Sequence, residues 1–147
     1  MLEQVVSMFD DYENMLKKLK KKSYEERMKG FREKYGHYFT EMTAYVENTD
    51  SDKRNTACLE IAEAFIGAVQ EKFQVNGKMK GRTQADLNFF MIYYVFPAIL
   101  LTEHESAKEI ADAICNKWGA SFKDSKIGYT TYDSLYGAFR EKIFGIF

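Results

Sequence analysis

Proline is almost absent from this 147-residue chain, where Pro97 is the only one, and glycine is scarce, at nine residues. An all-β fold needs many tight turns, and those turns depend largely on these two residue types. Their scarcity argues against such a fold. A length of 147 residues fits one ordinary domain, so we predict a single domain over residues 1–147.

Histidine and cysteine are also scarce, at two residues each, whereas zinc sites need three or four ligands, mostly of these types. His104-Glu105-Ser106-Ala107-Lys108 begins like the zinc-protease motif, but Lys108 stands where the second histidine is required. Asp50-Ser51-Asp52 begins like a calcium-binding loop, but Ile61 stands at the position of its last glutamate. We therefore predict no metal site and no cofactor.

Catalytic motifs are lacking too. The chain has no Gly-x-Ser-x-Gly nucleophile elbow. The segment Gly77-Lys78-Met79-Lys80-Gly81 has neither the preceding strand nor the Gly-Lys-Ser/Thr ending of a phosphate-binding loop. We assign no catalytic residue and expect a protein that is not an enzyme, although an active site assembled from scattered Asp, Glu and Tyr remains open.

The two cysteines, Cys58 and Cys115, lie in helical patterns, and the N-terminal residues show no basic stretch leading into an apolar one. Two buried thiols in a reducing cytoplasm are the simplest interpretation. A disulfide between them remains an alternative. We expect a cytoplasmic protein.

What the chain does have is a long uncharged stretch between Asp86 and Glu103, interrupted by Pro97. As a helix it would span about 24 Å, which is shorter than the roughly 30 Å hydrocarbon core of a membrane. A helix that is apolar all round must be surrounded by protein. We predict a central buried helix over about residues 84–101, kinked or broken at Pro97, and no association with a membrane.

Helical periodicity continues on both sides of this stretch. Two heptad seams precede it, the first over residues 2–19 and the second from Met28 to Tyr45, with Ser23 as the N-cap of the second. Further helical patterns cover residues 58–73, 107–118 and 132–143, and Thr102 is the predicted N-cap of the helix after Pro97. The predicted fold is an all-α single-domain bundle of about six helices around the central helix.

Two groups of residues are candidate binding sites. Lys17, Lys18, Lys21 and Lys22 belong to a strongly basic stretch and could bind an anion, although neighbouring acids could neutralise it as an ordinary solvated surface. With a net charge of −1 for the whole chain, nucleic acid is an unexpected partner. The second group, Asn88, Tyr93 and Tyr94, could line a pocket beside Pro97, although it could equally form a plain core.

The residues from Asn88-Phe89-Phe90 to the end of the chain, including Tyr129-Thr130-Thr131-Tyr132-Asp133, resemble the C-terminal part of small all-helical bacterial proteins that remain uncharacterised. The resemblance implies a compact helical domain. It carries over no catalytic residue and no ligand.

These features favour a non-catalytic helical module that binds a protein or has a regulatory role. Its partner is expected to be a protein, with a second copy of the chain as one option, because of the two heptad seams and the ten tyrosines. The alternative function is small-molecule binding in a tyrosine-lined pocket near Pro97.

Overall fold

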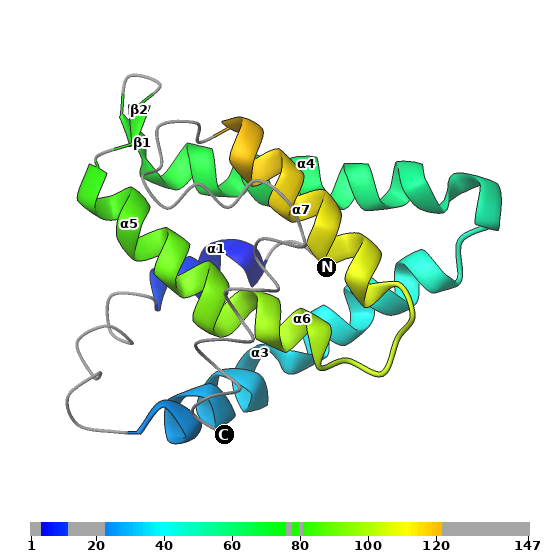
Figure 1. Cartoon of the computed structure of the whole chain (residues 1–147), viewed down its shortest axis with the longest axis horizontal. Helices are drawn as coiled ribbons and strands as arrows, with labels where there is room; N and C mark the ends of the chain where they lie inside the picture. The colour runs from blue at the N-terminus through cyan, green and yellow to red at the C-terminus, as the bar shows by residue number, and fades with distance from the viewer. Residues whose placement is uncertain (1–3, 12–22, 76–77, 80, 122–147) are drawn as a thin grey trace.

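The computed structural model describes residues 4–11, 23–75, 78–79 and 81–121 (Figure 1). The fold is all-α, as predicted. The helices are α1 (Gln4–Asp10), α3 (Tyr24–Glu47), α4 (Arg54–Phe73), α5 (Gly81–Phe90), α6 (Phe96–Leu100) and α7 (Ala107–Ser121). A 3₁₀ turn, η2 (Ser51–Lys53), precedes α4, and a π-helical turn, η3 (Met91–Val95), joins α5 to α6.

One small element is not helical. Strands β1 (Gln74–Val75) and β2 (Lys78–Met79) follow α4 and pair antiparallel, with Gln74 opposite Met79. The predicted helical pattern over residues 58–73 lies within α4, which begins earlier, at Arg54, and ends at Phe73. The predicted helix around residues 132–143 lies outside the described residues.

The segment α5–η3–α6 runs through the molecule as one rod and forms the predicted central element (Figure 1). Helices α4 and α7 lie side by side on one side of it, and α3 packs against α6 on the other. Ile92, Val95, Phe96 and Ile99 on the rod are at most 5% exposed. Their burial confirms that the uncharged stretch lies within protein.

The irregularity predicted at Pro97 takes the form of the π-helical turn directly before it. The backbone N–H of Phe96 donates to the carbonyl of Met91, which lies five residues earlier. Proline has no N–H, and its ring clashes with the carbonyl four residues before it in a regular α-helix. A wider turn relieves that clash, so the rod passes Pro97 without a break and continues to Leu100.

Helix α3 begins where the sequence predicts, because the Ser23 hydroxyl accepts a hydrogen bond of 3.2 Å from the backbone N–H of Glu26. Its buried face departs from the predicted heptad seam. Tyr45 is 47% exposed, whereas Phe39 and Val46 are fully buried. A straight α-helix drifts by about 20° per heptad, so over 24 residues its buried face follows the helical period and leaves the seam.

An aromatic cluster joins the N-terminal helix to the rest of the core. Phe9 on α1 packs against Phe65 on α4 and Phe90 on α5, with ring centroids 5.7 and 5.5 Å apart. Phe90 also contacts Phe31 and Tyr94, at 5.6 and 5.3 Å. These offset and edge-to-face contacts add to the apolar burial that holds α1, α3, α4 and the rod together.

Helix α7 begins later than predicted. The Thr102 hydroxyl donates to the carbonyl of Ile99 at 2.8 Å, so it completes the end of α6. The backbone N–H of Ile110 donates to the carbonyl of Ser106, and α7 starts at Ala107. The prediction that Thr102 is the N-cap was therefore wrong.

Candidate functional site

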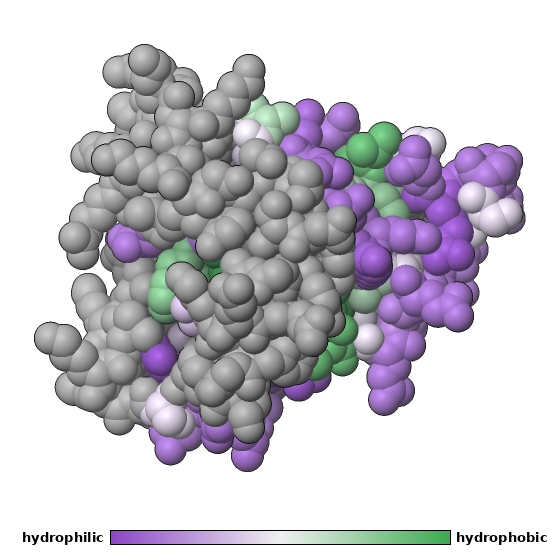
Figure 2. All heavy atoms as spheres, viewed as in Figure 1, coloured by the Kyte–Doolittle hydropathy of each residue, from purple (hydrophilic) through white to green (hydrophobic). Residues whose placement is uncertain are grey.

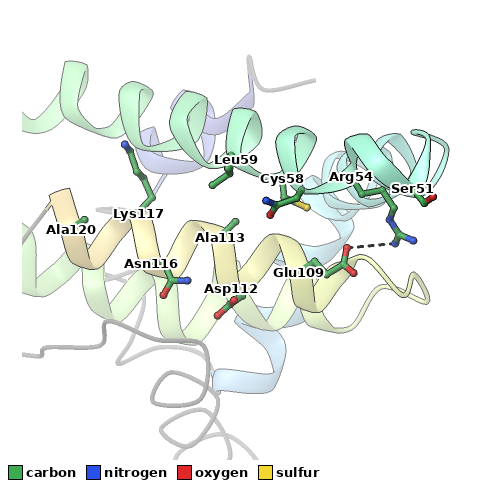
Figure 3. Close-up of a pocket in the computed structure, with 11 residues that line it drawn as sticks. Ser51, Arg54, Cys58, Leu59, Glu109, Asp112, Ala113, Asn116, Lys117 and Ala120 are labelled. Atoms are coloured by element: carbon green, nitrogen blue, oxygen red, sulfur yellow. Dashed lines mark ion pairs between the residues drawn. The ribbon is translucent and has the colours of Figure 1, made fainter.

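A groove of about 700 Å³ lies between α4 and α7. The two helices run in the same direction along it, and Figure 3 shows the residues that line it. Most of these side chains are exposed to solvent, so the groove is open along its length. Its lining residues are Ser51, Arg54, Asn55, Cys58, Leu59, Glu109, Asp112, Ala113, Asn116, Lys117 and Ala120.

An ion pair marks the end of the groove where both helices begin. A guanidinium nitrogen of Arg54 lies 3.6 Å from a carboxylate oxygen of Glu109, and more than half of the Glu109 side chain is exposed (Figure 3). Pairs of this kind contribute little to stability because water screens them. Glu109 is therefore free to exchange its partner at small cost.

The middle of the groove is apolar. Leu59 on α4 and Ala113 on α7 lie opposite each other, with Cys58 at the base (Figure 3). Leu59 is 49% exposed, which is unusual for the described apolar residues, most of which are buried. The groove thus presents an apolar side chain between two polar ends.

The other end of the groove is basic and polar. Lys117 reaches toward α4 and Asn116 lies on the outer side of α7 (Figure 3). Both side chains are exposed. Lys117 makes no ion pair with any residue in the described part of the chain.

The α7 wall of the groove is held in place by a carboxylate from another helix. Glu47, the last residue of α3, has one oxygen 2.7 Å from Nδ1 of His104. Its other oxygen accepts a hydrogen bond of 3.3 Å from the backbone N–H of Ser106. Backbone N–H groups at the start of a helix have no partner within it, and Glu47 supplies one. His104, which the sequence places in the first turn of a helix, lies in the turn before α7.

A second contact fixes Ser106, the residue directly before α7. The Ser106 hydroxyl donates at 2.8 Å to the backbone carbonyl of Thr43 on α3, and both side chains are fully buried. Because it is buried and hydrogen-bonded, this hydroxyl cannot serve as an exposed nucleophile beside His104. The Glu47 and Ser106 contacts together position α7.

We predict an acid-sensitive stability that depends on Glu47. The hydrogen bond from His104, helped by backbone N–H groups, lowers the pKa of Glu47 from 4.5 against the opposing effect of burial. Because the folded pKa is the lower one, the stabilisation is present above about pH 4.5 and is lost as the pH falls through the folded value. Glu47→Gln should reduce the melting temperature at pH 7 and flatten its fall between pH 5 and 3, as followed by circular dichroism.

Glu41→Gln is the matched control, because Glu41 is an exposed glutamate on the same helix. It should leave the acid profile unchanged. Identical profiles for the two variants would show that Glu47 does not secure the start of α7.

Both cysteines are buried and free, so the disulfide alternative is not formed. Burial, with a smaller contribution from Glu109, raises the pKa of Cys58. Burial and Asp112 raise the pKa of Cys115 to about 12. Since the thiolate is the reactive form, neither side chain is suited to nucleophilic chemistry at neutral pH.

The residues proposed for a pocket near Pro97 are packed against protein. The Asn88 side-chain oxygen accepts a hydrogen bond of 2.6 Å from the Trp118 indole. Tyr93 stacks on Phe89 with ring centroids 4.2 Å apart, and Tyr94 is 1% exposed in the aromatic cluster. The structure brings these three residues to one stretch of the rod, but they do not line the α4–α7 groove. Their role in ligand binding stays a prediction.

The basic candidates Lys17, Lys18, Lys21 and Lys22 lie outside the described residues. Two described lysines near the end of α1 are paired: Lys34 lies 2.6 Å from Asp11, and Lys72 pairs with Asp10. Lys34, Asp10 and Asp11 border a smaller hollow of about 330 Å³. Anion binding by the lysine cluster stays a prediction.

Within the described ranges, no three or more His, Cys, Asp or Glu side chains are grouped so as to hold a metal ion. In the same part of the chain, no helix combines the length and apolar character needed to cross a membrane. Figure 2 shows hydrophilic residues over much of the described surface near the α3–α4 turn, with small hydrophobic areas between them.

The groove was missed in the sequence because its lining residues do not share a motif. One signal was available: Glu109, Ala113 and Lys117 follow each other at intervals of four, so they share one stripe of α7. The buried stripe of that helix was predicted, and its exposed stripe was not considered. Leu59 could not be singled out, because the sequence does not show which leucines stay exposed after the helices pack.

Comparison of the chain with protein-family models, with curated protein sequences and with solved structures gives no match. The candidate site therefore stands on its geometry alone.

Proposed function

We propose that this protein is a non-catalytic protein-interaction module and that the α4–α7 groove is its binding surface. The observation that carries the proposal is the half-exposed Leu59, set in an open groove of about 700 Å³ between charged ends. Burying a leucine side chain against a partner is worth up to about 1.5–3 kcal/mol. Grooves between helices commonly bind a helix of a partner protein.

The charges around Leu59 support a protein partner in particular. Glu109 and Asp112 lie toward one end of the groove and Lys117 toward the other. Mixed charges of this kind suit a polypeptide that carries both signs, and they do not suit a polyanion such as nucleic acid. Cys58 is buried at the base of the groove, and its raised pKa keeps the thiol protonated.

The proposal includes a cytoplasmic location, as the sequence features suggest, and a bacterial origin, as the resemblance to small all-helical bacterial proteins implies. The two buried free cysteines support a reducing compartment.

Site-specific photocrosslinking in living cells tests the proposal. A benzophenone amino acid is placed at Asn55 or Asn116, which line opposite walls of the groove and are exposed. Glu41 on α3 is the control position. We expect both groove positions to give the same defined protein adduct, while the control position gives none.

The substitution Ala113→Arg serves as a blocking control, because it fills the middle of the groove. It should abolish both adducts while leaving the circular dichroism spectrum unchanged. Equal adduct yields from Glu41 and from the groove positions would contradict the proposal. So would the absence of any adduct from the groove, or a crosslink only to residues 122–147 of the same chain.

A further inference from the structure

We infer that the partner that fits the α4–α7 groove is a second copy of this chain, related by a twofold axis that passes near Ala113 and Leu59. The inference rests on the proposed function, since it names the partner of the same groove.

The order of charges along α7 supports this geometry. Glu109, Ala113 and Lys117 lie along one stripe, with each charged residue about 6 Å along the helix axis from the alanine. If a second α7 crosses antiparallel at Ala113, Glu109 of each copy faces Lys117 of the other. One stripe thus supplies both halves of two symmetric ion pairs.

Helix α4 supplies the other wall of the groove, and Leu59 lies near the middle of that wall (Figure 3). Because α4 and α7 run in the same direction, the same twofold axis makes the two copies of α4 antiparallel as well and brings Leu59 of one copy toward Leu59 of the other.

The centre of the groove also suits close packing. Ala113 has only a methyl group, so two helices can approach to the short end of the usual 8–10 Å range. The Leu59 side chains of both copies then share the buried centre. Lys117, which has no ion pair with a described residue, gains a partner, and Glu109 exchanges a weak intrachain pair for an intermolecular one.

A twofold arrangement closes on itself and leaves no groove open for a third copy. Two pairs of helices form a small interface, and interfaces of that size are commonly weak. We expect dimerisation in the micromolar range.

Charge exchange combined with analytical ultracentrifugation tests the inference. The intact chain is sedimented from about 5 to 500 µM, as wild type, Glu109→Lys, Lys117→Glu and the double variant. We expect a wild-type species of twice the 17.2 kDa chain mass. Each single reversal places like charges opposite each other twice, so the dissociation constant should rise at least about tenfold.

The double variant restores opposite charges across the axis, and its dissociation constant should return to within about threefold of wild type. Glu41→Lys and Arg32→Glu are the controls, because they make the same charge changes at exposed positions on α3. They should not affect dimerisation. Circular dichroism shows whether each variant is folded.

Three results would overturn the inference: a wild-type chain that stays monomeric to 500 µM, single variants that dimerise like wild type, or a double variant that is not rescued. The photocrosslinking distinguishes this failure from failure of the proposed function. An adduct with a different protein would support the groove as a binding surface and contradict the second copy as its partner. The absence of any groove adduct would contradict both the proposed function and this inference.

Discussion

Replacing Phe90 with alanine is expected to lower the free energy of unfolding by about 3–5 kcal/mol. Phe90 is fully buried, and its ring contacts Phe9, Phe31 and Tyr94 from three elements. Its removal takes apolar area from the core and leaves a cavity that α1 and α3 cannot both close. Urea denaturation followed by circular dichroism measures the loss.

Two comparison variants define this effect. Phe90→Leu retains most of the volume and should cost clearly less than the alanine variant. Leu101→Ala removes an apolar side chain that is 45% exposed at the end of the same rod, and it should change stability by less than about 1 kcal/mol. A loss below about 1 kcal/mol for Phe90→Ala would show that the aromatic cluster is not the centre of the core.

The second large effect concerns the hydrogen bond between α5 and α7. The Trp118 indole N–H donates to the Asn88 oxygen at 2.6 Å, and both side chains are nearly buried. Asn88→Leu removes the acceptor, and a buried donor left without a partner costs about 1–3 kcal/mol. Trp118 is the only tryptophan in the chain, so its fluorescence reports the unfolding transition at this position.

A double-mutant cycle separates the hydrogen bond from other effects of the asparagine. Trp118→Phe removes the donor, and in its presence Asn88→Leu should cost markedly less than in the wild type. If the two substitutions are additive, the indole and the amide do not stabilise each other.

The candidate groove depends on contacts that are distant from it. Glu47 and Thr43 on α3 fix the first residues of α7 through His104 and Ser106. The Asn88–Trp118 hydrogen bond fixes the last part of that helix against the rod. Glu109, Ala113 and Lys117 therefore lie along the groove because both ends of α7 are anchored elsewhere.

The sequence-based predictions were accurate where a feature depends on residues close together in the chain. The helical pattern over residues 107–118 was confirmed, because a short helix that packs on one side keeps its apolar residues in register. Six residues on the buried face of α7 are at most 6% exposed: Ala107, Ile110, Ala111, Ile114, Cys115 and Trp118. In the longer α3 the drift of the helical period exposed Tyr45, which a heptad pattern had counted as buried.

The sequence alone determined the all-α class, the buried rod and the Ser23 cap, because these depend on periodicity and on hydrogen bonds between neighbouring residues. Only the tertiary structure decided how the rod passes Pro97, where α7 begins and which exposed residues form a groove. The physical reason is that a backbone N–H at the start of a helix can donate to an acceptor from any part of the chain. Glu47 binds residues far along the sequence, and the groove between α4 and α7 exists only once those helices are packed.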